Sequence, residues 1–463
     1  MNDTDPLMAR AGGARLRRML EARSVAVVGA SDRPDSFGWR LTTEAFRSTG
    51  FSEVHLVHPR RREVFGQRCL PSLTEIPEPV DLVLLGVPDR ALVDQVSLAS
   101  ARGDGGAVVF GSATGLQTEL IEAAGTLDMC GAGCMGFVNA TRGVRAIGYL
   151  EPDPIPAGTI ALVTHSGSMF SALLRTHRRL EYSLIVSSGQ ELVTTAADYL
   201  GYALQLPETR VLGLILETPR DVPRLRNCLD AAARDDIPVV ALTVGRSVAG
   251  QALVDAHSGA LAGSDAGWEA LFTEYGVHRV DDLGELTDSL ETFAIGRRVR
   301  RGAAARGIAT VHDSGAERVL VADLAADLDV PFAPLSEPTR TALTALLEPG
   351  LAATNPLDVW GSGAKTEELF TRCLQILADD PGVDIVALAV DLVPELDGDD
   401  SFPRAVQAVL PTTDKPIVVL TNLPSAVDQD AAGALRACGV PVLEGTRSGL
   451  RAVGHLLRHG RPA

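Results

Sequence analysis

The stretch Ile160-Ala161-Leu162-Val163-Thr164-His165-Ser166-Gly167 returns in similar form as Ile308-Ala309-Thr310-Val311-His312-Asp313-Ser314-Gly315. Both stretches begin with apolar and β-branched residues, which are typical of a buried strand. Both end in Ser-Gly, a pair that suits the turn into a helix because serine is a favoured N-cap residue. The two stretches therefore predict one strand–turn–helix unit that is used twice.

Similar short apolar runs, each followed by a turn and a helical stretch, recur along the whole chain. The runs are Ser24–Ala30, Glu53–His58, Val80–Val87, Gly106–Gly111, Thr159–Thr164, Ser183–Val186, Arg210–Leu216, Ile237–Val244, Gly307–Val311, Val383–Val390, Lys415–Thr421 and Val440–Leu443. Strands that alternate with helices favour parallel sheets covered on both faces. We predict an α/β protein of three domains, a Rossmann-like domain followed by two flavodoxin-like domains with parallel sheets.

Two segments mark the predicted domain boundaries. The Pro-rich segment 151–156 cannot sustain a helix, and the segment 297–306 is a basic, Ala-rich connector. The predicted ranges are 1–21 for an N-terminal helix or tail, 22–151 and 152–298 for the first two domains, and 299–463 for the third. Residues 1–23 are amphipathic and lack an apolar core, so we expect a cap helix here and not a targeting segment.

Composition excludes several classes of function. The 463 residues carry a formal net charge of −17, which argues against binding to nucleic acid because phosphate backbones require clustered positive charge. No run approaches the roughly 20 apolar residues of a membrane span. The six cysteines are scattered, so we expect no metal site and a cytoplasmic protein with reduced thiols.

A histidine, His257, lies in the run of small residues Asp255-Ala256-His257-Ser258-Gly259-Ala260-Leu261-Ala262-Gly263. We expect a loop here, in which little bulk covers the imidazole. An imidazole is a good nucleophile near neutral pH and can accept a phosphoryl group and pass it on. The alternative is a flexible turn with an incidental histidine.

The first domain carries polar and glycine-containing turns at the predicted carboxyl ends of its strands, where open α/β sheets bind ligands. The turn Gly29-Ala30-Ser31, with Arg33, precedes a helix and suits phosphate binding. It lacks the full G-x-G-x-x-G pattern, and the second strand ends in His58-Pro59-Arg60 without the acidic residue that would bind a free ribose, which argues against a nicotinamide dinucleotide. The basic residues suit a phosphorylated ribose, or form a solvated turn. Gly86-Val87-Pro88 and Gly111-Ser112 follow the next two strands.

The second domain has two similar turns and one carboxylate. Ser166-Gly167-Ser168 and Ser188-Gly189 suit anion binding, although ordinary helix N-caps use the same residues. Glu217 follows the strand of residues 211–216, where it could hold an imidazole through one ring nitrogen or simply cap a helix.

Taken together, these motifs resemble the α subunit of the NDP-forming acyl-CoA synthetases, the superfamily that includes succinyl-CoA synthetase. The resemblance runs from about Ala22 to the C-terminus. It rests on Val28-Gly29-Ala30-Ser31, His58-Pro59-Arg60, Pro79-Val80-Asp81-Leu82, Gly86-Val87-Pro88, Leu162-Val163-Thr164-His165-Ser166-Gly167, Leu216-Glu217, Asn355-Pro356-Leu357-Asp358 and above all His257-Ser258-Gly259-Ala260-Leu261-Ala262-Gly263.

The resemblance implies reversible ligation of a carboxylic acid to coenzyme A. A nucleotide phosphorylates His257, the phosphoryl group passes to the carboxylate, and the CoA thiol attacks the acyl phosphate and releases phosphate. Glu217 orients the phosphohistidine. The implied CoA contacts are Gly29, Ala30, Ser31, Arg33, Arg60, Val87, Pro88 and Ser112. The implied phosphate and acyl site comprises Ser166, Gly167, Ser168, Ser188, Gly189, Gly133, Cys134 and Gly259.

Three positions depart from the pattern of the family. The usual Gly-Pro-Asn-Cys turn reads Gly131-Ala132-Gly133-Cys134, the usual glutamine of the Ser-Gln-Ser-Gly turn is His165, and the loop after Gly189 reads Gln190-Glu191-Leu192-Val193-Thr194-Thr195. The substrate therefore differs from acetate or succinate, or the chemical step is impaired. His165 is either a second acid–base group or a tolerated change.

The resemblance also implies a partner. No ATP-grasp module is recognisable in the sequence, so ATP or GTP with Mg²⁺ is expected on a separate ATP-grasp β subunit. The alternative function is a non-catalytic CoA- or acyl-CoA-binding protein that regulates or scaffolds a partner. The altered Gly131–Cys134 turn favours this alternative, and the intact His257 and Glu217 weigh against it.

Overall fold

The computed structural model describes residues 6–178, 180–258, 264–299, 306–362 and 365–459. The chain forms two compact units, residues 1–275 and 276–463. Twelve of its strands coincide with the twelve predicted runs, and the α/β class with mostly parallel sheets is confirmed. Among the described helices, none is long and apolar enough to cross a membrane.

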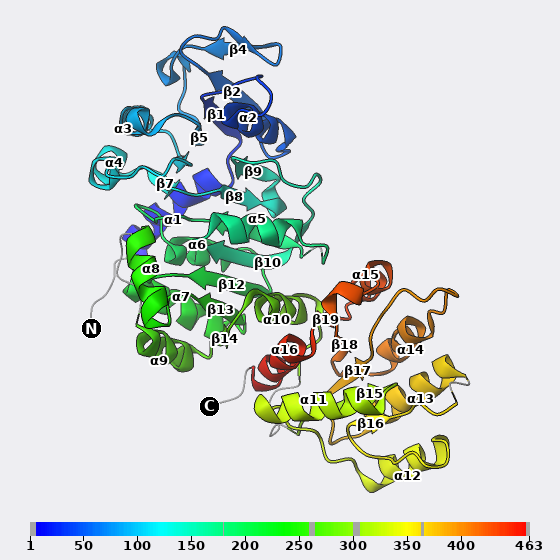
Figure 1. Ribbon diagram of the computed structural model, residues 1–463. Coiled ribbons are helices and arrows are strands. Elements are labelled where there is room, and N and C mark those ends of the chain that lie inside the picture. Colours follow the sequence, from blue (N-terminus) through cyan, green and yellow to red (C-terminus); the bar gives the residue numbers. More distant parts are fainter. Residues whose placement is uncertain (1–5, 179, 259–263, 300–305, 363–364, 460–463) are drawn as a thin grey trace. The chain divides into compact units, whose positions relative to one another are not determined.

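The first unit begins with helix α1 (Pro6–Leu20) and a sheet of seven strands in the order β3-β4-β2-β1-β5-β6-β7. The strands are β1 (Ser24–Val28), β2 (Glu53–Val57), β3 (Glu63–Val64), β4 (Gln67–Leu70), β5 (Leu82–Leu85), β6 (Gly106–Val109) and β7 (Asp128–Gly131). All neighbours pair in parallel except β3 and β4. Helix α2 (Phe37–Arg47) lies on one face, and α3 (Leu92–Arg102) and α4 (Gln117–Ala124) lie on the other (Figure 1).

The same unit contains strands of a second sheet, in the order β13-β12-β10-β11-β8-β9. These strands are β8 (Gly136–Asn139), β9 (Val144–Ile147), β10 (Ala157–Thr164), β11 (Tyr182–Ser187), β12 (Val211–Leu216) and β13 (Val239–Thr243). Its helices are α5 (Gly167–Arg175), α6 (Ala196–Ala203), α7 (Val222–Arg234), α8 (Val248–Ser258) and α9 (Asp265–Tyr275). The antiparallel hairpin β8–β9 pairs with β11, although its residues fall in the range predicted for the first domain.

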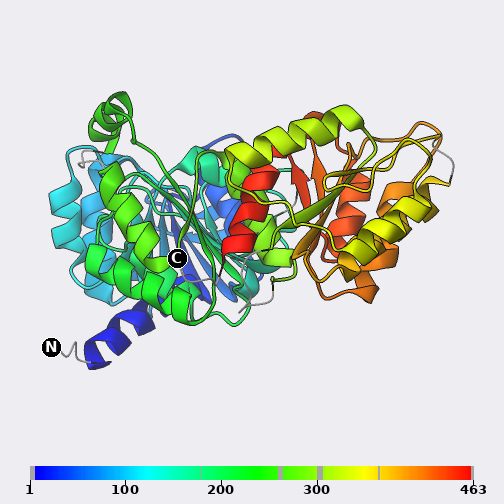
Figure 2. The same cartoon turned by 90° about the horizontal axis from the view of Figure 1, so that it is seen from below.

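The second unit contains β14 (His278–Val280), α10 (Leu283–Ile295) and a parallel sheet in the order β16-β15-β17-β18-β19. Its strands are β15 (Ile308–His312), β16 (Leu357–Asp358), β17 (Ile385–Ala389), β18 (Ile417–Thr421) and β19 (Val442–Glu444). Its further helices are α11 (Gly315–Asp327), α12 (Glu337–Leu346), α13 (Thr366–Asp379), α14 (Ser401–Val409), α15 (Gln429–Ala437) and α16 (Thr446–Arg458). Helices α11 and α16 cover one face of the sheet, and α13 and α14 cover the other (Figures 1 and 2).

The predicted strand–turn–helix unit occurs in both places. Ser166 is the N-cap of α5 and accepts a hydrogen bond from the backbone N–H of Met169. Ser314 is the N-cap of α11 and accepts one from Glu317. Each serine satisfies a helix N–H that has no partner within the helix.

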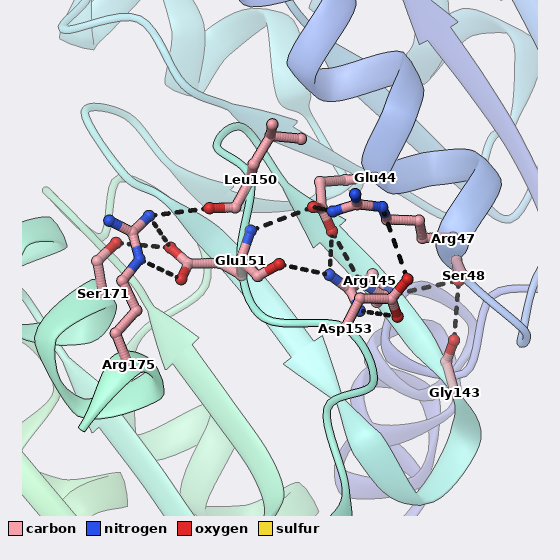
Figure 3. A network of polar contacts seen from close by, with 10 residues as sticks. All are labelled: Glu44, Arg47, Ser48, Gly143, Arg145, Leu150, Glu151, Asp153, Ser171 and Arg175. Atoms are coloured by element: carbon pink, nitrogen blue, oxygen red, sulfur yellow. Dashed lines mark hydrogen bonds and ion pairs between the residues drawn. The ribbon is translucent and has the colours of Figure 1, made fainter. Parts of the chain in front are cut away.

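A buried ion pair links the first sheet to the hairpin β8–β9 (Figure 3). Glu44 of α2 is fully buried, and its Oε2 accepts from Arg145 Nε of β9 at 2.7 Å. Arg145 also donates to Asp153 Oδ1 at 3.1 Å, and the N–H of Glu151 donates to Glu44 Oε1 at 3.2 Å. Every charge in this buried group therefore has a partner, which is the condition under which buried charges are tolerated.

The network continues to helix α5. The Glu151 carboxylate accepts from Arg175 Nε at 2.7 Å and from Ser171 Oγ at 2.8 Å, while Arg175 Nη2 reaches the carbonyl oxygen of Leu150 at 2.9 Å (Figure 3). The hydrogen bond that Arg175 donates to the Glu151 carboxylate raises the pKa of Arg175. These contacts fix α2 and α5 relative to the same hairpin. Each of these helices begins at a turn that we predicted to bind phosphate.

We expect Arg145→Met to lower the free energy of unfolding by about 3 kcal/mol, because it leaves the buried Glu44 carboxylate without its main partner. The double variant Glu44→Met/Arg145→Met should lose less, since neither charge remains. Urea unfolding of the three proteins measures the difference. A double variant that is less stable than Arg145→Met would contradict this account of the network.

Asp128, at the start of β7, gives a pH prediction. Burial, followed by repulsion from Asp198, raises its pKa from 3.8 to about 6, and its Oδ2 has no hydrogen-bond partner among the described residues. The pKa of Asp128 is higher in the folded than in the unfolded protein, so the folded state is favoured when Asp128 is protonated. This contribution to the free energy of unfolding is complete below pH 3.8 and is lost as the pH rises through about 6. Asp128→Asn should therefore unfold at a higher urea midpoint than the wild type at pH 8 and lose that advantage at pH 4. An equal difference at both pH values would contradict the assignment.

Candidate active site

The turn after β11 meets the turn after β7. The N–H of Gln190 donates to the carbonyl oxygen of Ala132 at 2.9 Å, and its side-chain Nε2 donates to the carbonyl oxygen of Ser112 at 2.7 Å. The N–H of Leu192 donates to the carbonyl oxygen of Gly131 at 3.0 Å. The carboxyl ends of the two sheets of the first unit are therefore joined by backbone hydrogen bonds at one place.

The approach at this place requires glycine at position 189. Gly189 has φ +61°, in the left-handed region that side chains disfavour. A Cβ atom there would lie 2.2 Å from the carbonyl oxygen of Ala132 and 3.1 Å from Cβ of Cys134. The contact between the two turns therefore depends on the missing side chain.

Cys134 is held inside this junction. Its Sγ lies 3.4 Å from the carbonyl oxygen of Val109 and 4.0 Å from Sγ of Cys130. Burial, reinforced by the neighbouring Cys130 thiol, raises the pKa of Cys134 well above its ordinary value. The thiol therefore stays protonated at neutral pH, which favours a packing role and not that of a nucleophile.

The turn after β10 lies beside the turn after β11. Ser188 donates to the carbonyl oxygen of Thr164 through its backbone N–H at 2.9 Å, and the N–H of Ser166 donates to Oγ1 of Thr164 at 3.0 Å. The hydroxyls of Ser166 and Ser168 are 3.1 Å apart at the start of α5. Gly167 lies close to Met135, since a Cβ atom there would be 2.7 Å from Cγ of Met135. The structure thus brings together the predicted phosphate and acyl residues that it describes, on the turns after β7, β10 and β11.

Glu217 is joined to these turns through His165. The backbone N–H of Glu217 donates to Nδ1 of His165 at 3.1 Å. On the other side of the ring, Nε2 lies 3.2 Å from Oε1 of Glu191, at an ion-pair distance but without the alignment of a hydrogen bond. The side chains of His165 and Glu191 are 6% and 1% exposed, whereas Glu217 is half-buried.

The turn Gly29-Ala30-Ser31 leaves little space for side chains. Gly29 has φ +93°, and a Cβ atom there would lie 2.2 Å from the carbonyl oxygen of Gly86. The N–H groups of Gly29 and Ala30 both donate to the carbonyl oxygen of Val57. Ser31 Oγ accepts from the N–H of Arg33 at 3.1 Å, and the Arg33 side chain is exposed.

The remaining predicted CoA residues lie at the ends of the neighbouring strands. Nδ1 of His58 accepts from the N–H of Arg60 at 3.1 Å, and the Arg60 side chain is exposed. Burial and the nearby arginines lower the pKa of His58, which keeps Nδ1 available as an acceptor. Val87 and Pro88 follow β5 directly. Ser112 donates through Oγ to Asp89 Oδ2 at 3.2 Å, so its loop is tied to the one after β5.

The phosphoryl acceptor predicted at His257 is only partly described. Residues 255–258 form the last turn of α8, so the prediction that this part of the sequence is a loop is wrong. Alanine and the short apolar residues of α8 favour the helix up to Ser258. The His257 side chain and all of Gly259 lie outside the described parts of the chain, so their place in the site stays a prediction.

Two hollows lie near this edge of the second sheet. A small one, of about 10 Å³, is lined by residues that include Glu191, Leu216 and Thr218. A larger one, of about 250 Å³, lies between α7 and α9 and is lined by residues that include Val222 and Trp268. Glu217 lines neither hollow, although its chain neighbours Leu216 and Thr218 line the smaller one.

Sequence reasoning missed two residues that organise the site. Gln190 was noted only as a departure from a pattern, and Asp89 was not noticed. Both act through contacts with residues more than 20 positions away, which no local motif encodes. An acid directly after a strand-ending Val-Pro pair was the available signal for Asp89.

Two domain families match the chain. A CoA binding domain matches residues 23–140, and a succinyl-CoA ligase like flavodoxin domain matches residues 157–293. The chain thus combines a CoA-binding domain with a ligase-type flavodoxin domain, which confirms the resemblance drawn from its motifs.

The relatives include acetate–CoA ligases [ADP-forming]. The chain is 28% identical to acetate–CoA ligase [ADP-forming] I of Archaeoglobus fulgidus over 96% of its own length and 64% of that protein. It is 28% identical to trans-feruloyl-CoA synthase FCS1 from an unknown prokaryotic organism, covering 96% of this chain and 65% of the relative. It is 27% identical to the α subunit of acetate–CoA ligase [ADP-forming] II of Pyrococcus furiosus, covering 91% of this chain and 93% of that subunit. The chain therefore spans about two thirds of some relatives and nearly all of another.

The fold agrees with a solved structure. The apo form of dinucleotide forming acetyl-coenzyme A synthetase 1 of Ca. Korarchaeum cryptofilum superposes with a TM-score of 0.83 at 20% identity, covering 96% of this chain and 98% of that one.

We expect Gly189→Ala to separate the two turns, because its Cβ atom would collide with backbone. The matched control is Gly103→Ala, since Gly103 has φ +77° and open space around it. Gly103→Ala should lower the free energy of unfolding by about 1 kcal/mol, because alanine disfavours the left-handed backbone conformation. Gly189→Ala should lower it by at least about 1 kcal/mol more, because its Cβ atom also collides with backbone. Equal urea midpoints for the two variants would contradict the close approach.

Proposed function

We propose that this chain is the CoA-binding and phosphohistidine-carrying α subunit of an NDP-forming acyl-CoA synthetase. The observation that carries the proposal is the junction of the Gly131–Cys134 turn, the Ser188–Glu191 turn and Ser112. It places the edge of the CoA-binding domain against the edge of the ligase-type domain. A reaction that joins CoA to an activated acid requires such a meeting of two sites.

The proposed reaction has three steps. The terminal phosphoryl group of a nucleoside triphosphate is transferred to His257, and the nucleoside diphosphate leaves. A substrate carboxylate then takes the phosphoryl group from His257 and becomes an acyl phosphate. The CoA thiol finally attacks the acyl carbon and releases phosphate, which divides one difficult step into easier ones.

The residues of the chain have distinct proposed roles. The start of α5, with Ser166, Gly167 and Ser168, supplies hydroxyls and the positive end of a helix for the phosphoryl group. Glu217 accepts a hydrogen bond from one nitrogen of His257 and leaves the other nitrogen free to attack. The turn at Gly29 and the exposed Arg33 and Arg60 bind the phosphates of CoA, because they combine close backbone approach with mobile positive charge.

The nucleotide and its Mg²⁺ are proposed to lie on a separate ATP-grasp β subunit. The match to nearly the full length of an α subunit from Pyrococcus furiosus supports a divided enzyme. The longer relatives show that the same region also occurs within larger proteins. The altered Gly131–Cys134 turn supports an acid substrate that differs from acetate or succinate.

We expect His257→Ala to lower acyl-CoA formation about 1000-fold or more when the chain is assayed with its β subunit, nucleotide, CoA and a panel of acids, because the covalent step is lost. CoA binding, measured by calorimetry, should stay within about twofold of the wild type, since the CoA turns lie elsewhere. Glu217→Gln serves as the milder variant, with less phosphorylated protein but unchanged CoA binding. Full turnover by His257→Ala would overturn the proposal, and CoA binding without any turnover by the wild type would favour a binding protein.

A further inference from the structure

His165 connects two loops that each carry a carboxylate. The paired register of β10 and β12 ends at Thr164 and Ile215. Beyond that point the N–H of His165 still donates to the carbonyl oxygen of Ile215 at 3.0 Å, and the N–H of Glu217 then donates to the side-chain Nδ1 of His165 at 3.1 Å. The side chain of His165 thus accepts a hydrogen bond from the backbone of Glu217 just beyond the end of the paired strands.

This hydrogen bond fixes the protonation of the ring. Nδ1 accepts a hydrogen bond from a backbone N–H and therefore carries a lone pair. The single proton of the neutral imidazole is then assigned to Nε2, on the side of the ring that faces Glu191. This Nε2–H is buried and, among the described residues, has no aligned hydrogen-bond acceptor.

Glu191 completes the connection on the other side. Its Oε1 lies 3.2 Å from Nε2 of His165 and accepts from Ser188 Oγ at 2.8 Å. The side chain of Glu191 is 1% exposed, and burial of a polar group at such a position requires polar partners. Glu191 also has φ +52°, so its loop adopts a conformation that a side chain disfavours and that its contacts must stabilise.

We propose that His165 is a positioning residue that fixes the backbone of Glu217 against the Ser188–Glu191 turn, and thereby sets the direction of the Glu217 carboxylate. This inference rests on the proposed function, in which that carboxylate holds the imidazole of His257. His165 touches no reacting atom in this account. Its Nδ1 accepts the hydrogen bond from Glu217, and Nε2 faces the carboxylate of Glu191 at 3.2 Å.

The chemistry of the two ring nitrogens suggests a matched pair of variants. Glutamine also offers one acceptor and one donor at the end of its side chain, so His165→Gln can keep both contacts. Leucine is apolar and of comparable size, so His165→Leu removes both contacts while filling much of the same space. Any effect of losing the two polar contacts should therefore appear in His165→Leu and be absent from His165→Gln.

The first test needs no catalytic activity. Hydrogen exchange resolved to single amides should show the Glu217 N–H exchanging about tenfold faster in His165→Leu, as expected for the loss of one hydrogen bond. In His165→Gln the exchange rate of the Glu217 N–H should stay within about threefold of the wild-type rate. Unchanged protection of the Glu217 amide in His165→Leu would overturn the inference. If His165→Leu does not fold, His165→Ala takes its place, and unchanged protection of the Glu217 amide in that variant would overturn the inference equally.

The second test measures the phosphorylation of His257, the step in which the Glu217 carboxylate is proposed to act. With a panel of acyl-CoA thioesters and labelled inorganic phosphate as the source of the phosphoryl group, His165→Leu should form acid-labile phosphoprotein about tenfold more slowly than the wild type, with CoA affinity unchanged. His165→Gln should restore the rate, which a general loss of stability would not do. Labelling of His165→Leu at the wild-type rate would overturn the inference. A wild type that is not labelled at all would instead count against the proposed function, and the exchange test would still decide the role of His165.

Discussion

The buried ion pair between Glu44 and Arg145 is the constraint on which the first unit depends. Helix α2, which packs on the first sheet, supplies the carboxylate, and the hairpin β8–β9 of the second sheet supplies the guanidinium. Such a pair stabilises a fold only when every charge is satisfied, and here Asp153 and the backbone of Glu151 complete the set. Because Glu151 also binds Arg175 of α5, the two helices whose first turns are proposed to bind phosphate are both fixed to one hairpin.

This constraint explains why the candidate site forms where it does. With the hairpin fixed, the turn after β7 and the turn after β11 approach closely enough for backbone hydrogen bonds, and only glycine fits at position 189. The turns after β7, β10 and β11 carry no arginine or lysine, although Arg220 lines the smaller hollow beside them. The same turns offer hydroxyls, backbone N–H groups and a helix N-terminus, with Glu191 and Glu217 nearby. Such a site suits a phosphoryl group that is handed on, because tight binding by arginine or lysine would oppose its release.

The sequence was most informative where local chemistry decides the structure. All twelve predicted strands occur, since buried parallel strands have a continuous apolar signal, and both Ser-Gly turns cap helices as predicted. Short strands were missed because two to four residues carry little pattern. The hairpin of β8 and β9 was missed because it joins the sheet through the non-local pairing of β8 with β11. Residues 255–258 were expected in a loop but continue α8, because a run of small residues containing alanine is compatible with both. The contacts of Gln190, Asp89 and His165 could not be predicted, since each joins the ends of different strands.

The central claim is that this chain carries a phosphoryl group on His257 between acyl phosphate and nucleotide. It is tested most directly in the reverse direction, which needs no nucleotide subunit in the proposed scheme. The purified chain is incubated with acyl-CoA thioesters and labelled inorganic phosphate, and acid-labile, base-stable label is mapped by mass spectrometry. The account predicts label on His257 with at least one thioester and none when CoA thioester is omitted. Label on another residue, or none with any thioester although CoA binds, would contradict it.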